Sequence, residues 1–186
     1  LWSAAGTLGS GRPHAVRLAF LSVLFEAAGL PQQYPLVKFT IWAGENSYLE
    51  SIEAAVIAAD RTYEDEVANL YVSPIISKAL LEADPTLGES ITDVRNLLQK
   101  QFPPQTDDIS DDAMFQTVEE VLRLQSDTEG RYPLTLIVLD EMQQYLGDDN
   151  VKTLAVQNIV EGVSSRFDNS VLFVATGQSA MGATPT

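Results

Sequence analysis

The sequence of 186 residues contains no cysteine and a single histidine. Disulfides, thiolate metal sites and histidine-rich metal sites are therefore excluded for these residues, and the absence of cysteine is typical of an intracellular protein. Basic residues are also scarce, with 11 against 26 acidic residues and a formal net charge of −15. The average surface should repel polyanions, so we expect no direct contact with nucleic acid or with an anionic membrane surface. No apolar run approaches the roughly 20 residues that a membrane-spanning helix needs.

The remaining composition is that of an ordinary globular protein. Hydrophobic residues make up 45% of the chain and charged residues 20%, which favours a folded chain over a disordered one. The length predicts a single domain over residues 1–186. Because the chain starts with Leu1 rather than methionine, we expect it to be a fragment of a longer protein, so that parts of a site could lie outside it.

The order of predicted elements indicates an α/β fold. Helical spacing of apolar residues predicts a helix over 14–28, and alternation predicts a strand over 36–42. Two further apolar runs predict strands at 134–140 and 171–176, with a helix between them that starts at Asp148 or Asp149. Sequential strands joined through helices are typical of a parallel sheet.

The stretch 46–128 has almost no strand signal and several helix starts. Capping residues mark these starts at Ser47, Thr62, Ser73 and Ser90. The sequence therefore predicts an all-helical insert over 46–128 within the α/β core.

The strongest candidates for catalytic residues lie where the strand at 134–140 ends. The run Leu-Thr-Leu-Ile-Val-Leu leads directly to the acidic pair Asp140 and Glu141, as in the Walker B segment of nucleotide-hydrolysing P-loop proteins. In that interpretation Asp140 holds Mg²⁺, directly or through water, and Glu141 orients the attacking water. The alternative is a buried strand that ends in a polar turn.

A second polar strand end follows one helix later. The strand at 171–176 ends in Thr176, with Gln178 two residues on. In P-loop ATPases of the additional-strand class, a neighbouring strand ends in a polar residue that senses the γ-phosphate and helps to place the attacking water. Thr176 or Gln178 could serve here, and together with the acidic pair they favour a nucleotide site that takes Mg²⁺ and ATP.

The phosphate-binding loop is incomplete. Residues 6–13 read Gly-Thr-Leu-Gly-Ser-Gly-Arg-Pro, with two glycines at the Walker A spacing. Arg12 replaces the required lysine, and Pro13 replaces the hydroxyl residue that binds the metal. Either this is a degenerate loop, or the true loop lies upstream of Leu1. The second interpretation is preferred because the five residues before Gly6 are too few for a well-formed strand.

Several segments resemble a known family. They are residues 11–21, 25–31, 69–74, 139–146 and 176–178. These segments are similar to the large P-loop proteins of bacterial BREX phage-defence systems, of the BrxC and PglY type, and to related uncharacterised bacterial proteins. The Asp-Glu pair followed by Gln143, Gln144 and Tyr145 is the most specific part.

The resemblance implies a larger, cytoplasmic bacterial ATPase that uses Mg²⁺ and ATP and works with other subunits of a defence assembly. Its acidic pair would be Asp140 and Glu141, and its polar strand end would be Thr176 with Gln178. The expected fold is a partial P-loop NTPase core of the additional-strand class. Other copies of the same chain are a second possible partner, in a homo-oligomer. Without an intact Walker A segment, we expect these residues alone to be inactive. The alternative function is a catalytically silent protein-interaction domain.

Overall fold

The computed structural model describes residues 1–8, 15–128 and 130–177. The fold is mixed α/β, and the chain divides into two compact units. The sheet unit comprises Leu1–Gly29 and Asp107–Thr186, and the helical unit comprises Leu30–Thr106. Among the described residues, no helix is long and apolar enough to cross a membrane.

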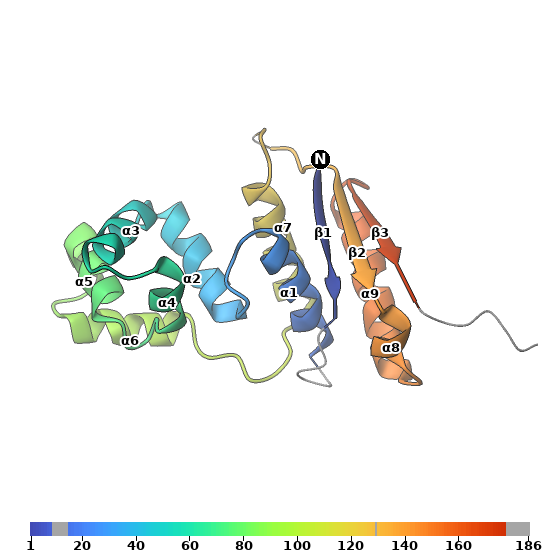
Figure 1. The fold of residues 1–186 in the computed structure, drawn as a ribbon, viewed down its shortest axis with the longest axis horizontal. Coiled ribbons are helices and arrows are strands. Elements are labelled where there is room, and N and C mark those ends of the chain that lie inside the picture. The colour runs from blue at the N-terminus through green and yellow to red at the C-terminus, as the bar shows by residue number, and fades with distance from the viewer. Residues whose placement is uncertain (9–14, 129, 178–186) are drawn as a thin grey trace, which may run out of the picture. The chain divides into compact units, whose positions relative to one another are not determined.

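The sheet unit contains a three-stranded parallel sheet in the order β1-β2-β3 (Figure 1). Its elements are β1 (Trp2–Thr7), α1 (Val16–Ala27), α7 (Asp111–Leu124), β2 (Thr135–Asp140), α8 (Met142–Leu146), α9 (Asn150–Arg166) and β3 (Val171–Ala175). Thr7 is in register with Asp140, and Leu139 is in register with Ala175. All three strands therefore reach their carboxyl ends at the same edge of the sheet.

Helices α1 and α9 pack on one face of this sheet, and α7 packs on both of these helices. Helix α1 packs on β1, α7 and α9, and its Phe20 ring lies 6.0 Å from the Phe173 ring on β3. Gly162 of α9 lies against the Phe115 ring of α7, where an added Cβ would collide with the ring. Ala4 and Ile137, which share this face, are fully buried.

The opposite face of the sheet is open in the described residues. Side chains alternate between the two faces of a strand. The alternate positions Leu172 and Val174 are 62% and 42% exposed, and Ser3, Ala5, Thr7 and Asp140 are exposed too. Parallel sheets are usually covered on both faces, so this sheet is half-covered by the described part of the chain.

The helical unit has a hydrophobic core of its own. Its elements are α2 (Tyr34–Glu45), α3 (Leu49–Ala58), α4 (Tyr63–Ala68), α5 (Pro74–Ala83), η1 (Pro85–Leu87) and α6 (Ile91–Gln101). The core includes Phe39, Ile52, Leu80 and Leu98, all fully buried. Predicted capping is confirmed at Thr62, Ser73 and Ser90, whose hydroxyl oxygens accept hydrogen bonds from amides of the first helical turn.

The predicted strand at 36–42 is wrong, because these residues belong to helix α2 (Tyr34–Glu45). Pro35 occupies the first turn of this helix, a position that suits proline. Leu36, Val37, Phe39 and Ile41 are all buried, so the apparent alternation reflects a helix with a wide buried surface. An apolar run of seven residues is too short to separate the two structures by periodicity.

The third strand of the sheet is β1 (Trp2–Thr7), which the sequence did not predict. The statement that too few residues precede Gly6 for a strand is therefore wrong, since Gly6 lies inside β1. The middle of the strand, residues 3–6, consists of small residues of low strand propensity, and parallel pairing with β2 stabilises it. Gly6 suits the covered face, because a Cβ there would lie 3.3 Å from Val23 of α1.

Two boundaries of the predicted insert also differ. The helical unit covers 30–106, whereas the expected insert covered 46–128, and α7 (Asp111–Leu124) belongs to the sheet unit. Ser47 does not cap α3, because Tyr48 is the residue before the helix and Ser47 has a positive φ of 62°. The predicted strands at 134–140 and 171–176 are confirmed as β2 and β3, and Asp149 caps α9 as predicted.

Candidate active site at the carboxyl edge of the sheet

The predicted polar residues meet at the carboxyl edge of the sheet. Asp140 is the last residue of β2, and Glu141 follows it as the residue before α8. Thr176 follows β3 directly. Because β2 and β3 are adjacent and parallel, the two strand ends lie side by side.

Hydrogen bonds join Asp140, Glu141 and Thr176. The Thr176 hydroxyl donates to Asp140 Oδ1. The Glu141 amide donates to the same Oδ1 over 2.9 Å and approaches Thr176 Oγ1 at 3.4 Å. Backbone bonds hold the same turn, from the Met142 amide to the Thr176 carbonyl and from the Thr176 amide to the Leu139 carbonyl, each 3.0 Å long. The structure thus brings together three of the four predicted residues.

Glu141 has an unusual backbone conformation. Its φ of 52° and ψ of 31° place it in the left-handed region, which costs a residue with a Cβ free energy unless its side chain is Asn or Asp. This conformation turns the chain sharply between β2 and α8. Strained residues of this kind cluster at functional sites, where the surrounding structure enforces them.

The donor set at this edge fits a hard cation but does not enclose one. Asp140 offers a carboxylate and Thr176 a hydroxyl, both exposed oxygen donors of the kind that Mg²⁺ prefers. Among the described residues, no group of three or more His, Cys, Asp or Glu side chains could hold a metal ion. This composition suits Mg²⁺ bound through one carboxylate, water and the phosphates of a substrate.

Gln178, the fourth predicted residue, lies outside the described residues. Another amide side chain is close to the same turn: Gln143 of α8 lies against Gly177, where an added Cβ would be 3.4 Å from Gln143 Cβ and 3.5 Å from Oε1. In the sequence, Gln143 could have been found as a candidate because it lies in the segment that directly follows the acidic pair.

The start of α1 is occupied by a carboxylate of the chain itself. Asp108 accepts hydrogen bonds from the amides of Arg17 (3.3 Å) and Leu18 (3.2 Å). The Arg17 guanidinium pairs with Asp108 at 3.1 Å and with Asp111 at 2.6 Å. The hydrogen bond to Asp111 is the largest cause of a raised Arg17 pKa, and burial opposes it.

This arrangement bears on the glycine-rich segment before α1. Amides at a helix start are the groups that would bind a phosphate in a P-loop. At α1 the Arg17 and Leu18 amides already donate hydrogen bonds to Asp108, which argues against the degenerate-loop interpretation. Residues 9–14 of that segment, including Arg12 and Pro13, lie outside the described residues.

Tyr145 of α8 has a hydroxyl without a hydrogen-bond partner in the described residues, although that oxygen is buried. Burial is the main cause of its raised pKa, and the negative charges of Asp108 and Asp149 add to it. Lys152 Nζ lies 5.0 Å from the centre of the Tyr145 ring. In the sequence, Tyr145 was a candidate only because it lies in a segment that resembles the family. No sequence pattern indicated a role for Lys152.

Arg166, near the end of α9, is engaged within the sheet unit. Its guanidinium lies 4.2 Å from the centre of the Phe115 ring, and Nη2 is 3.6 Å from Asp112 Oδ1. Through these contacts Arg166 stabilises the packing of α9 on α7.

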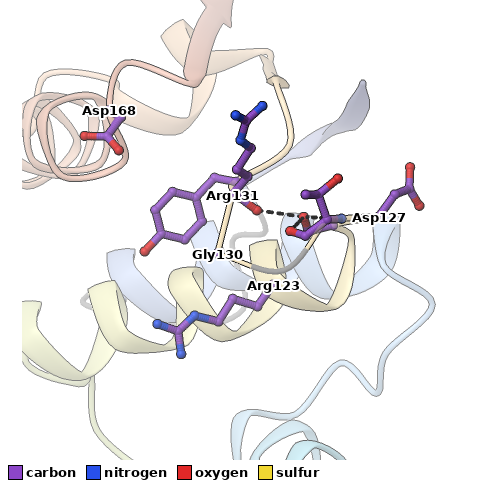
Figure 2. A pocket seen from close by; sticks show the side chains of 8 residues that line it. Arg123, Asp127, Gly130, Arg131 and Asp168 are labelled. Atoms are coloured by element: carbon purple, nitrogen blue, oxygen red, sulfur yellow. Dashed lines mark hydrogen bonds between the residues drawn. The ribbon is translucent and has the colours of Figure 1, made fainter.

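A cavity of about 770 Å³ lies near the opposite, amino edge of β2 and β3 (Figure 2). It is lined by Arg123, Ser126, Asp127, Thr128, Gly130, Arg131, Tyr132 and Asp168. Several of its polar groups are already paired: Arg123 and Tyr132 bind Glu119, at 2.5 and 2.8 Å, and the Ser126 hydroxyl donates to the Arg131 carbonyl at 2.6 Å. Ligands of open α/β sheets bind at the carboxyl ends of the strands, which favours the Asp140 edge as the functional site.

Comparison of the chain with known protein families, with curated proteins and with solved structures finds no match in any of the three.

Proposed function

We propose that these residues form part of an ATP-binding and ATP-hydrolysing P-loop protein. The observation that carries the proposal is the contact between the ends of β2 and β3, in which the Thr176 hydroxyl donates to Asp140 Oδ1 and the Glu141 amide binds the same oxygen. A carboxylate pair beside a hydroxyl, at the carboxyl edge of a parallel sheet, is compatible with Mg²⁺ that is also bound by the phosphates of ATP.

Each residue has a distinct role in this proposal. Asp140 binds Mg²⁺ directly or through water, and Glu141 accepts a hydrogen bond from the attacking water. Thr176 hydrogen-bonds with the γ-phosphate or with that water. When bound, Mg²⁺ neutralises charge that develops on the phosphate oxygens.

The phosphate-binding residues are proposed to come from a Walker A loop upstream of Leu1. The occupied start of α1 supports this, because Asp108 already uses the Arg17 and Leu18 amides. The 186 residues alone are then expected to bind ATP weakly and to be inactive. The resemblance to BREX proteins favours a defence assembly with other subunits as the context.

Thermal unfolding during a Mg-ATP titration tests the proposal. The chain and its Asp140→Ala variant are compared with a longer natural chain that includes the upstream sequence, and with the same variant in that chain. Saturation at about 100 times Kd stabilises by roughly 2.7 kcal/mol, which raises Tm by an amount that decreases as the chain length increases. We expect this rise in the longer chain and its loss in Asp140→Ala.

The opposite result would favour the second function. If the longer chain shows no stabilisation by Mg-ATP, the ATPase proposal is rejected and a catalytically silent interaction domain remains. The compact helical unit with its own core, over Leu30–Thr106, would be the first surface to test for partners in that case.

A further inference from the structure

The carboxyl edge of the sheet contains one more oxygen-bearing side chain, on β1. Thr7 is the last residue of β1 and is in register with Asp140. Residues in register on neighbouring parallel strands present their side chains on the same face of the sheet. Thr7, Asp140 and Thr176 therefore form a row across three adjacent strand ends, on the open face.

The two oxygens of Asp140 differ in their surroundings. Oδ1 accepts from the Thr176 hydroxyl and from the Glu141 amide. No hydrogen bond joins Oδ2 to any described residue. Oδ1 faces Thr176, which follows β3, and Thr7 ends β1, the strand on the other side of β2.

We propose that Thr7 is a further residue of the cation site, and that its hydroxyl binds the divalent cation held by Asp140 Oδ2, directly or through one water. This inference rests on the proposed function. Neighbouring strands are about 4.8 Å apart, so a cation with oxygen ligands at about 2.1 Å fits between the two strand ends. Thr176 keeps Asp140 oriented from the other side, which leaves Oδ2 free for the cation.

The sequence around Thr7 is compatible with this role. The other open-face residues of β1 are Ser3 and Ala5, which are small and exposed in the described part of the chain. Thr7 itself is exposed, and its threonine side chain suits a strand end. A hydroxyl is a hard, neutral ligand, so it adds to a magnesium site without the repulsion that a third carboxylate would introduce.

The test uses Mn²⁺ as a paramagnetic substitute for Mg²⁺ with the 186-residue chain. Mn²⁺ is titrated while the broadening of the Leu139 and Ala175 amide signals is followed by NMR. Wild type is compared with Thr7→Val, which removes the hydroxyl but keeps the shape, with Thr7→Ser, which keeps the hydroxyl, and with Asp140→Asn. We expect Thr7→Val to weaken Mn²⁺ binding by roughly tenfold, Thr7→Ser to stay near wild type, and Asp140→Asn to lose saturable broadening.

The outcomes separate the two proposals. Equal Mn²⁺ affinity in wild type and Thr7→Val, with binding lost in Asp140→Asn, would reject the role of Thr7 and leave the Asp140 site standing. Absence of saturable broadening in wild type would reject both the cation site and the contribution of Thr7. Equal weakening in Thr7→Ser and Thr7→Val would show a structural effect of position 7 and would also reject the inference. Chemical shifts away from the sheet edge verify that each variant is folded.

Discussion

Replacing Glu141 with glycine should stabilise the sheet unit, because Glu141 adopts a left-handed backbone conformation with φ 52°. That conformation costs a residue with a Cβ about 1–2 kcal/mol, and glycine adopts it freely. Glycine also loses more backbone entropy on folding, by about 0.5–1 kcal/mol. The expected net gain for Glu141→Gly is therefore about 0.5–1 kcal/mol in the free energy of unfolding. Glu141→Ala keeps the strain and should change stability little.

Urea unfolding followed by tryptophan fluorescence measures this gain. The chain has two tryptophans, Trp2 in the sheet unit and Trp42 in the helical unit, so each reports on one unit when the other is replaced by phenylalanine. Glu141→Gly should move the Trp2 transition to higher urea, by about 0.3–0.5 M at ordinary m-values. Ser47→Gly is the matched control away from the site: with φ 62° it should move only the Trp42 transition. A Glu141→Gly protein less stable than Glu141→Ala would refute the reasoning.

The remaining predictions use the same two reporters. Gly162→Ala should destabilise the sheet unit by about 1–3 kcal/mol, because its Cβ would collide with the Phe115 ring, whereas helix propensity alone favours alanine by about 1 kcal/mol. Gly44→Ala is its control in α2: the new Cβ would meet only the flexible end of Leu49, so a stabilised Gly162→Ala would contradict the packing described. Tyr145→Phe should leave stability unchanged or raise it by about 1 kcal/mol, since it removes a buried hydroxyl that has no partner in the described residues. Tyr71→Phe should instead cost about 1 kcal/mol, because the Tyr71 hydroxyl donates to the Phe102 carbonyl at 2.6 Å; equal effects of the two changes would count against this assignment.

The sequence predicted the acidic strand end and its neighbour because both depend on local pattern. Strands of a parallel sheet are typically uninterrupted apolar runs, and both β2 and β3 contain such a run followed by a polar residue. Their adjacency then places Asp140 beside Thr176. Helix caps at Thr62, Ser73 and Ser90 were also predictable, because the capping bond joins residues three apart.

The other features of the fold and of the site depend on tertiary contacts, which the local sequence pattern does not encode. The middle of strand β1 consists of small residues, and its strand conformation depends on pairing with a segment more than 100 residues later. Helix α2 has the apolar density of a strand because the helical unit buries most of its surface. The role proposed for Thr7 follows from register with Asp140, which sequence alone could not supply. Likewise, the bond between Asp108 and the start of α1 joins residues about 90 positions apart.

The central claim is that the Asp140 edge supports ATP hydrolysis when the phosphate loop is present. The most direct measurement is phosphate release from Mg-ATP by the longer natural chain that includes the upstream sequence, with Glu141→Gln as the variant and nucleotide binding measured in parallel. The account predicts that Glu141→Gln retains Mg-ATP binding and loses hydrolysis by about tenfold or more, because the neutral amide accepts a weaker hydrogen bond from the attacking water than the carboxylate does. Hydrolysis at the wild-type rate in Glu141→Gln, or no hydrolysis by the wild-type chain with nucleotide bound, would contradict it.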